Sequence, residues 1–519
     1  MIENQIHENC GVVGVIAPKG VNSSSIAAKV GAELQHRGQE GGGMGTKKNG
    51  GNFNVYKEGR RFGLAFSSDR TLRKRHLVGE ISLAHTRYRT TGPANDIDYT
   101  QPMLVEENGR TMMGGHNGNI ANAESLKGEL LSHGVKLKTS NEQYPVSDSE
   151  VLFHRIARAP GGNWGEKVAR GLEGVEGSYC LTIATDNDEL IAVRDPWGIR
   201  PLSFGRLDGH WIVASETSVL DKIRAIDQRE VDKGQMWIFR SGKEPESFYF
   251  DSSKKKQYCD FEDWYFSWPS SRRNNIETNL IREESGRQLA LEEIKLGRLI
   301  NADLVTCVPD TGRSSAVPFA EKLGIPYRDR IFKERYDDKG VRSFIGSNDL
   351  LRTSILEDKY LLSQDLRGRV VYIVDDTGIR LKTTEILNRA LRQQTGVKEI
   401  HWRFAAPKFV RPCFLGVNIN QREELGAVEF IGGRWVIKED CEIAKSIGAD
   451  SVAFLSVQGK NRVREVFGED PNDFCGYCHG ENGPSFGMSK YDQGLLLESG
   501  RSPTFLDKRK TALSMLSVV

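Results

Sequence analysis

The chain contains no long hydrophobic run, and this absence limits the class of protein it can be. None of its 519 residues belongs to an apolar stretch approaching the roughly 20 residues that a membrane-spanning helix needs. The first nine residues are polar and do not form the apolar core of a secretory signal. We therefore expect a cytoplasmic protein that does not enter a membrane.

An excess of charge of either sign is also missing. The sequence has 72 Lys and Arg residues against 70 Asp and Glu residues, for a formal net charge of +2. A chain so close to neutrality gives no general electrostatic reason to bind nucleic acid or a membrane surface. We see no internal repeat and no long low-complexity segment, and the length suggests two to four domains of about 150 residues each.

Cysteine is scarce as well, with eight residues in the whole chain. In a reducing compartment these are thiols or metal ligands rather than disulfides. Cys10 is distinctive because a short polar leader precedes it and an apolar, glycine-spaced segment follows it. If residues 1–9 are a propeptide, their removal leaves Cys10 with a free α-amino group (reference pKa about 7.7–8.0) that can accept the thiol proton. The alternative is a small buried cysteine beside a strand.

Motifs downstream of Cys10 suit the hydrolysis of glutamine. Asn117 and Gly118, in the run at 115–119, offer a side-chain amide and a backbone N–H for an oxyanion. Arg87, in the motif at 85–92, offers a planar fork for a carboxylate, and Asp148, in the motif at 147–150, suits an ammonium group. Each motif alone also fits a turn or a helix N-cap. Together, behind one cysteine, they indicate an amidohydrolase site.

With further motifs at 34–40 and 194–202, residues 10–240 resemble the class II, N-terminal nucleophile (Ntn) glutamine amidotransferases. This resemblance implies a four-layer αββα sandwich. The implied roles are Cys10 as nucleophile, Arg87 and Asp148 as glutamine ligands, Asn117 and Gly118 as the oxyanion hole, and Arg37 as a glutamine-site residue that braces the loop over the cysteine.

The second half has a different pattern, which begins after a polar, lysine-bearing boundary at 251–256. An amphipathic helix is predicted over 278–299, and buried strands are predicted over 303–309 and 369–374. Short apolar strands that alternate with helices predict a parallel α/β sheet. The expected division of the chain is a propeptide at 1–9, domains at 10–240 and 260–460, and a C-terminal segment at 461–519.

The run at 375–384, DDTGIRLKTT, has the chemistry of a phosphate-binding loop. Paired carboxylates at a strand end can bind ribose hydroxyls or Mg²⁺, and N–H and hydroxyl groups at a helix start can hold a phosphate. An ordinary loop with an N-cap is the alternative. In context the run resembles the phosphoribosyl pyrophosphate (PRPP) motif of type I phosphoribosyltransferases, 308–312 resembles their pyrophosphate loop, and 333–336 with 341–345 resembles their closing loop.

This second resemblance implies a ligand set for PRPP and its metal. The implied PRPP-binding residues are Asp375, Asp376, Thr377, Thr383, Thr384 and Lys333, and the implied Mg²⁺ ligands are Asp375, Asp376 and Thr311.

The two domains in this order resemble the amidophosphoribosyltransferase family over residues 10 to about 480. The resemblance implies an enzyme of purine synthesis that passes ammonia from glutamine through an interior channel to C1 of PRPP, where it displaces pyrophosphate. It also implies a homo-oligomer and makes purine nucleotides candidate inhibitors.

The phosphate loop departs from the family pattern DDSIVRGTT, and two of the departures fall where the pattern has its glycine and first threonine. Leu381 replaces a glycine and Lys382 replaces a threonine. Because glycine lets the backbone approach a phosphate closely, we expect Leu381 to place a side chain in the cradle and to weaken PRPP binding. Two alternatives follow: a second domain rebuilt to aminate another electrophile, or a nucleotide-binding regulator without catalysis.

Four cysteines match the cluster cysteines of the family's iron–sulfur branch. They are Cys259, Cys413, Cys475 and Cys478. The resemblance implies a [4Fe–4S] cluster, for which four thiolates are suitable ligands. Structural zinc is the alternative, since four cysteines also suit a tetrahedral ion. The cysteines at 180, 307 and 441 are expected to pack in the core.

Overall fold

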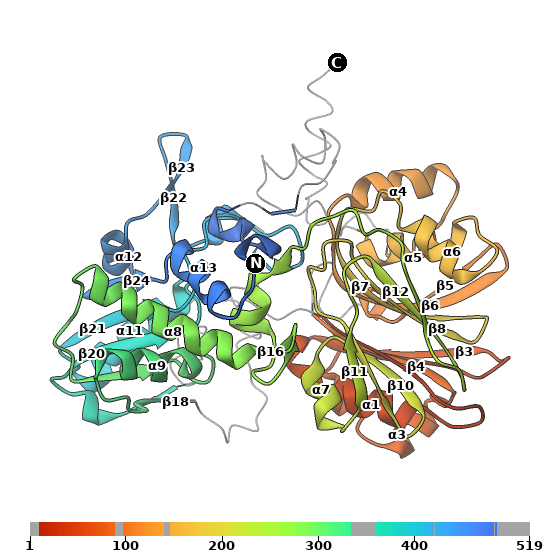
Figure 1. The fold of residues 1–519 in the computed structure, drawn as a ribbon, viewed down its shortest axis with the longest axis horizontal. Coiled ribbons are helices and arrows are strands. Elements are labelled where there is room, and N and C mark those ends of the chain that lie inside the picture. The colour runs from red at the N-terminus through yellow and green to blue at the C-terminus, as the bar shows by residue number, and fades with distance from the viewer. Residues whose placement is uncertain are drawn as a thin grey trace.

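A computed structural model describes residues 10–88, 97–139, 146–333, 360–419, 421–481 and 483–484. The expected propeptide, the expected closing loop beyond Lys333 and the polar tail lie outside the described residues. Two bodies lie side by side, one built on two stacked sheets and the other on a single sheet (Figure 1).

The first body contains two antiparallel sheets. In spatial order, the first sheet is β11 (Ile226–Glu230), β9 (Ser203–Leu207), β10 (His210–Ala214), β1 (Gly11–Ile16), β4 (Ile81–Arg87), β2 (Gly41–Lys47) and β3 (Phe53–Glu58). In the same way, the second sheet is β13 (Glu246–Tyr249), β12 (Gln235–Arg240), β8 (Glu189–Arg194), β7 (Gly177–Thr185), β6 (Arg110–Ile120) and β5 (Met103–Glu107).

Helices cover the outer face of each sheet (Figure 1). The helices on the first sheet are α1 (Ser24–Glu33), α2 (Phe62–Ala65), α3 (Asp69–Lys74) and α7 (Thr217–Lys222). The helices on the second sheet are α4 (Ala123–Ser132), α5 (Asp148–Arg158) and α6 (Trp164–Gly171).

The alternation of side chains along β1 explains this layering. Val12 packs between the sheets with Met113 and Leu190, whereas Val13 packs under α1 with Val30. Because neighbouring strand residues point to opposite faces, an unbroken apolar strand must be covered on both sides. The expected αββα sandwich is confirmed.

The second body contains a parallel sheet with helices on both faces. Its strands in spatial order are β17 (Leu304–Cys307), β20 (Val370–Asp375), β21 (Glu399–Phe404) and β24 (Ser451–Phe454). The helices on one face are α8 (Thr278–Lys295), α9 (Arg313–Leu323) and α13 (Val457–Val466), and those on the other are α11 (Lys382–Thr395) and α12 (Asp440–Ile447).

Strand β20 shows why this sheet needs two layers of helices. Ile373 packs with the helix residues Leu387 and Ile443, and Tyr372 packs with Phe319 on the opposite face. The predicted parallel α/β sheet is therefore confirmed. The helix predicted over 278–299 ends earlier, at Lys295, because Gly297 takes a left-handed conformation with φ +63°.

Short strand pairs connect or extend these bodies. They are β14 (Tyr258–Cys259) with β25 (Phe474–Cys475), β15 (Arg272–Arg273) with β16 (Ile276–Glu277), β18 (Ile331–Lys333) with β19 (Tyr360–Leu362), and the projecting hairpin of β22 (Val428–Ile431) and β23 (Arg434–Ile437) (Figure 1). A π-helical turn, η3 (Glu262–Phe266), follows β14.

Within the described part of the chain, no helix is both long enough and apolar enough to cross a membrane. Of the three cysteines expected in the core, Cys180 and Cys307 are buried. The expectation for Cys441 is wrong, because it is exposed on α12. The buried face of that helix is formed by Ile443, Ala444 and Ile447 instead.

Candidate functional site

Cys10 stands directly before β1 and faces the end of β4. Its Sγ lies 3.3 Å from the carbonyl oxygen of Tyr88 and accepts the Tyr88 backbone N–H at 3.3 Å. Burial raises the pKa of the Cys10 thiol to about 11, although the Tyr88 hydrogen bond and the charge of Arg87 oppose the rise. The thiol is therefore protonated at neutral pH and requires a base before it can attack a substrate.

The structure brings four of the expected site residues into one pocket. Cys10, Arg87, Gly118 and Asp148 line it together with Tyr88, Tyr99, Gln101, His116, Ser147 and Ser149. A guanidinium and a carboxylate in the same small pocket match the carboxylate and ammonium of an α-amino acid.

The strand β6 provides the expected oxyanion donors. Gly118 has φ +148°, and a Cβ at this position would lie 2.0 Å from the carbonyl oxygen of Ser178, so only glycine fits. Its neighbour Asn117 is 1% exposed. Neither polar atom of the Asn117 side chain has a hydrogen-bond partner among the described residues. A buried amide without a partner is suited to a group that binds only during reaction.

Asp148 is held by the backbone at the start of α5. Its Oδ2 accepts the Ile120 backbone N–H at 3.0 Å, and its Oδ1 accepts the Ser149 backbone N–H at 2.8 Å. These donors come from the end of β6 and from the first turn of the helix. They orient the carboxylate and stabilise its charge at a helix N-terminus.

A polar triad behind this carboxylate was not predicted from the sequence. Ser149 Oγ lies 2.9 Å from His116 Nδ1 and accepts from Gln101 Nε2 at 3.1 Å. Gln101 Oε1 in turn accepts the His116 backbone N–H at 2.6 Å. His116 and Ser149 belong to the motifs at 115–119 and 147–150, but only the fold brings them into contact with each other and with Gln101.

Arg37 lies beneath the nucleophile, in a buried ion network, and not in the lining of the pocket. Its Nε donates to the Cys10 carbonyl oxygen at 3.4 Å, and its Nη1 donates to Glu216 Oε1 at 2.6 Å. Its Nη2 donates to Glu262 Oε1 at 2.9 Å. No spacing in the sequence relates either carboxylate to Arg37, which lies 179 residues from Glu216 and 225 from Glu262.

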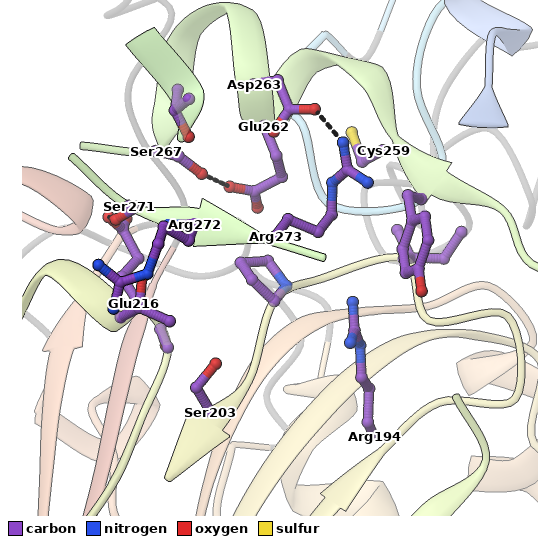
Figure 2. Close-up of a pocket in the computed structure, with 16 residues that line it drawn as sticks. Arg194, Ser203, Glu216, Cys259, Glu262, Asp263, Ser267, Ser271, Arg272 and Arg273 are labelled. Atoms are coloured by element: carbon purple, nitrogen blue, oxygen red, sulfur yellow. Dashed lines mark hydrogen bonds and ion pairs between the residues drawn. The ribbon is translucent and has the colours of Figure 1, made fainter. Parts of the chain in front are cut away.

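Glu216, before α7, and Glu262, in η3, both pair with Arg37 and both line one pocket (Figure 2). Burial alone would raise the pKa of both carboxyls. Arg37 and Arg200 hold the pKa of Glu262 below its ordinary value, and His36 and Arg37 hold that of Glu216 far below it. Both residues are therefore ionised at neutral pH.

Most of the expected PRPP residues lie between the end of β20 and the first turn of α11. Burial raises the pKa of Asp376, while Arg282, Asp375 and Thr311 oppose that rise, so Thr311 lies within reach of this carboxyl. The Thr377 N–H donates to Asp376 Oδ1 at 2.6 Å. Asp375 stands at the end of β20, and Thr383 and Thr384 lie in the first turn of α11. Lys333 is the last expected ligand, and its Nζ lies 3.8 Å from Asp310 Oδ2.

Leu381 takes the left-handed backbone that a glycine would adopt, with φ +58°. The structure differs from our expectation for its side chain, which is 6% exposed and packs in the hydrophobic core instead of standing in the loop. It covers Gly426, where an added Cβ would meet Leu381 Cδ1 at 2.7 Å. Lys382 is exposed, and its Nζ pairs with Glu385 Oε2 at 2.9 Å.

The loop at 375–381 rests on the segment at 418–426. Arg380 Nη2 donates to the Asn418 carbonyl oxygen at 2.9 Å and to Glu424 Oε2 at 2.7 Å. The Gly426 backbone N–H donates to the Ile379 carbonyl oxygen at 2.8 Å. The phosphate loop is therefore held in place by a segment about 40 residues further along the chain.

The four cysteines of the expected cluster also converge. β14 and β25 pair in parallel with Cys259 opposite Cys475, and both residues line one apolar pocket with Cys413 and Cys478. Burial raises the pKa of Cys259 to about 12, although the charge of Arg200 opposes the rise. Within the described residues, no three His, Cys, Asp or Glu side chains are grouped closely enough to hold a single metal ion.

Comparisons with known proteins agree with this geometry. The sequence profile of the glutamine amidotransferase domain matches residues 85–222. The chain is 32% identical over 473 residues to an amidophosphoribosyltransferase of Archaeoglobus fulgidus, a match that covers 90% of this chain and 96% of that protein. It is also 32% identical to amidophosphoribosyltransferases of Bacillus subtilis (91% of this chain, 93% of that protein) and Homo sapiens (88% of each).

Solved structures extend the similarity to both bodies. The glutamine PRPP amidotransferase of Bacillus subtilis, complexed with ADP and GMP, aligns with a TM-score of 0.79 and 30% identity over 93% of this chain and 98% of that one. A structure described as the allosteric regulatory enzyme of purine biosynthesis aligns with a TM-score of 0.79 and 31% identity over 92% and 97%. With nearly the whole length covered at this identity, the chain belongs to the amidophosphoribosyltransferase family.

Proposed function

We propose that this enzyme hydrolyses glutamine at Cys10 and transfers the ammonia to PRPP, forming 5-phosphoribosylamine in the first step of purine synthesis. The observation that carries the proposal is the shared pocket of Cys10, Arg87, Asp148 and Gly118. Arg87 holds the α-carboxylate of glutamine and Asp148 holds its ammonium group. The side-chain amide is thereby directed toward Cys10.

In the first half-reaction, Cys10 Sγ attacks the amide carbon of glutamine. The tetrahedral oxyanion is stabilised by the Asn117 side-chain amide and the Gly118 N–H. Collapse gives a γ-glutamyl thioester and ammonia, and water then releases glutamate. Because burial raises the pKa of Cys10 to about 11, the base has to lie close to the thiol. We assign this role to the α-amino group of Cys10 after removal of residues 1–9.

In the second half-reaction, ammonia passes through an interior channel and displaces pyrophosphate from C1 of PRPP. Asp375, Asp376 and Thr311 offer oxygen ligands for Mg²⁺, which would supply charge shielding of the leaving pyrophosphate. The site fits such an ion because Asp376 Oδ2 is buried and has no hydrogen-bond partner among the described residues. Thr377, Thr383, Thr384 and Lys333 are the remaining proposed contacts to PRPP.

The four cysteines at the apolar pocket are proposed ligands of a [4Fe–4S] cluster. Zn–S bonds of about 2.3 Å would draw four sulfurs to within roughly 3.8 Å of one another. What supports a shared site is that all four cysteines line one pocket, and structural zinc stays the alternative to a cluster. The resident group would tie the segment after β14 to the C-terminal segment.

The remaining proposals concern the whole protein. We propose domains at 10–240 and 260–460 with a C-terminal segment at 461–519, a cytoplasmic location, and a homo-oligomeric state. Purine nucleotides are proposed inhibitors, which is supported by the ADP and GMP bound to the Bacillus subtilis relative.

Replacement of the nucleophile tests the proposed chemistry. We expect Cys10→Ala to lose all pyrophosphate release driven by glutamine and to retain release driven by ammonium chloride, because ammonia from solvent bypasses the thiol. Normal glutamine hydrolysis by Cys10→Ala would reject the assignment. Release of ammonia from glutamine by the wild-type enzyme without any PRPP consumption would favour another electrophile. Nucleotide binding without either activity would favour a regulator.

Two analytical measurements test the processing and the cluster. Intact-mass spectrometry should show active protein that begins at Cys10, and residues 1–9 on fully active enzyme would reject the propeptide. Anaerobically purified protein should hold about four iron atoms per chain. One zinc and no iron would instead assign the four cysteines to a single ion.

A further inference from the structure

Glu262 is a buried carboxylate that reaches from the start of η3 into the first body. Its Oε1 accepts from Arg37 Nη2 at 2.9 Å and from Arg200 Nη1 at 3.0 Å. Its Oε2 accepts from Arg37 Nη1 at 3.1 Å and from Ser267 Oγ at 3.3 Å, and Figure 2 shows the contact with Ser267. The side chain is only 5% exposed, so both oxygens are bound by protein groups.

The contacts of Arg37 direct this carboxylate's effect to the nucleophile. Arg37 is wholly buried, and Glu262 accepts hydrogen bonds from two of its nitrogens in a bidentate pair. Glu216 accepts from Nη1 on the other side. With the planar guanidinium held in this way, its Nε is directed at the Cys10 carbonyl oxygen, 3.4 Å away. Arg37 therefore links the Cys10 backbone to a carboxylate of η3, which lies outside the two sheets of the first body.

We propose that Glu262 is a positioning residue for the glutaminase nucleophile, acting through Arg37 on the backbone of Cys10. The inference rests on the proposed function, in which Cys10 attacks glutamine. Glutamine hydrolysis would then be assembled across two segments 225 residues apart in sequence, because the first body by itself lacks this carboxylate.

The adjacent residue, Asp263, provides a matched control. It lies on the same turn and is also buried, but its Oδ2 accepts from Arg273 Nη2 at 2.7 Å and from Arg464 Nη1 at 2.7 Å. Figure 2 shows Asp263 directed toward Arg273. A general disturbance of η3 would affect variants of both acids, whereas the proposed role belongs to Glu262 alone.

The test compares Glu262→Gln with Asp263→Asn in the full-length holoenzyme. For Glu262→Gln we expect kcat for glutamine hydrolysis to fall by about 10- to 10²-fold, because a small misplacement of a nucleophile is costly. KM for glutamine should change by less than about threefold, since Arg37 does not line the glutamine pocket. Asp263→Asn should retain the wild-type kcat, and both variants should retain activity driven by ammonia.

Alkylation of Cys10 by a diazoketone analogue of glutamine gives a second readout. We expect Glu262→Gln to react more slowly across the pH range, with Glu262→Asp partly restoring the rate because it keeps the charge. In a double-mutant cycle, Arg37→Lys combined with Glu262→Gln should be no slower than the worse single variant, as two residues acting in series are not additive.

Three results separate the possible failures. Wild-type kcat and alkylation in Glu262→Gln would overturn the positioning role. An equal loss in Asp263→Asn, or additive losses with Arg37→Lys, would show a structural disturbance instead. Cys10→Ala assayed alongside keeps the proposed function distinct, because retained glutaminase activity there rejects the nucleophile, whatever Glu262 does.

Discussion

Gly118 in the first body and Leu381 in the second both hold a positive φ beside a proposed binding site, at +148° and +58°. A side chain at the first position would place Cβ 2.0 Å from the Ser178 carbonyl oxygen, in the neighbouring strand of the same sheet. The second position carries a leucine whose side chain has space, because the residue it covers is Gly426.

This difference shows that a left-handed position is restricted by its neighbour as much as by its own backbone. In β6, the obstacle is the main chain of β7, which cannot move without breaking the sheet. In the phosphate loop, the facing glycine provides the space, and Leu381 accepts strain of about 1–2 kcal/mol in return for a buried side chain.

The largest expected effect is the loss of glutamine hydrolysis when Gly118 is replaced. We expect Gly118→Ala to lower glutamine hydrolysis by more than about 10³-fold, because the added methyl displaces the oxyanion N–H and the strand that carries it. The matched control is Gly109→Ala, another left-handed glycine of the same body, where an added Cβ meets nothing within 4 Å. Steady-state glutaminase assays of both variants measure the difference, and comparable losses would contradict the steric argument.

Asn117→Ala tests the other donor of the same strand. Its side-chain amide has no partner among the described residues, so the unreacted enzyme should lose little stability. We expect glutaminase kcat to fall by about 10² to 10³-fold, the usual effect of losing one oxyanion donor. The thermal midpoint and kcat should be measured together, since a large fall in the midpoint would point to a structural amide.

Leu381→Gly tests how much the buried leucine at the second position contributes to stability. Loss of a buried leucine costs about 2–5 kcal/mol and relief of the left-handed strain returns about 1–2 kcal/mol, so we expect a net loss of stability of about 2 kcal/mol, within a range of about 0–4 kcal/mol. PRPP affinity should change little, because the leucine side chain packs in the core and does not stand in the phosphate loop. Denaturant unfolding and a PRPP titration with Mg²⁺ measure the two effects.

The facing residue provides the control for Leu381. Gly426→Ala should destabilise the wild-type protein, where its Cβ would meet Leu381 Cδ1 at 2.7 Å, but should be tolerated in Leu381→Gly. Additive losses of stability in the double variant would contradict the proposed steric coupling between Leu381 and Gly426. Tighter PRPP binding by Leu381→Gly would show that the leucine weakens the site despite its buried side chain.

The smallest expected effect concerns acid stability. The folded-state pKa of Glu262 lies below its ordinary value of 4.5, so its stabilising contribution is fully present above pH 4.5 and is lost as the pH falls through the folded-state value. Glu262→Gln should therefore show a shallower fall in thermal midpoint below pH 4.5 than the wild type. Parallel curves would contradict the assigned ion network.

The sequence by itself determined the parts of the molecule that depend on neighbours in the chain. Short apolar strands that alternate with helices predicted the parallel sheet, the motifs behind Cys10 carried the resemblance that implied the sandwich, and the motif at 115–119 indicated oxyanion donors. These features are local because each depends on the order of residues within a short segment.

Only the tertiary structure decided which distant residues form ion pairs or pack against one another. Glu262 lies 225 residues from Arg37, and no spacing in the sequence relates them. Leu381 was expected in the phosphate cradle, and Gly426, 45 positions further on, gave its side chain another location. Buried charges and buried side chains are satisfied by whatever the fold brings against them, and that contact is not written in any local pattern.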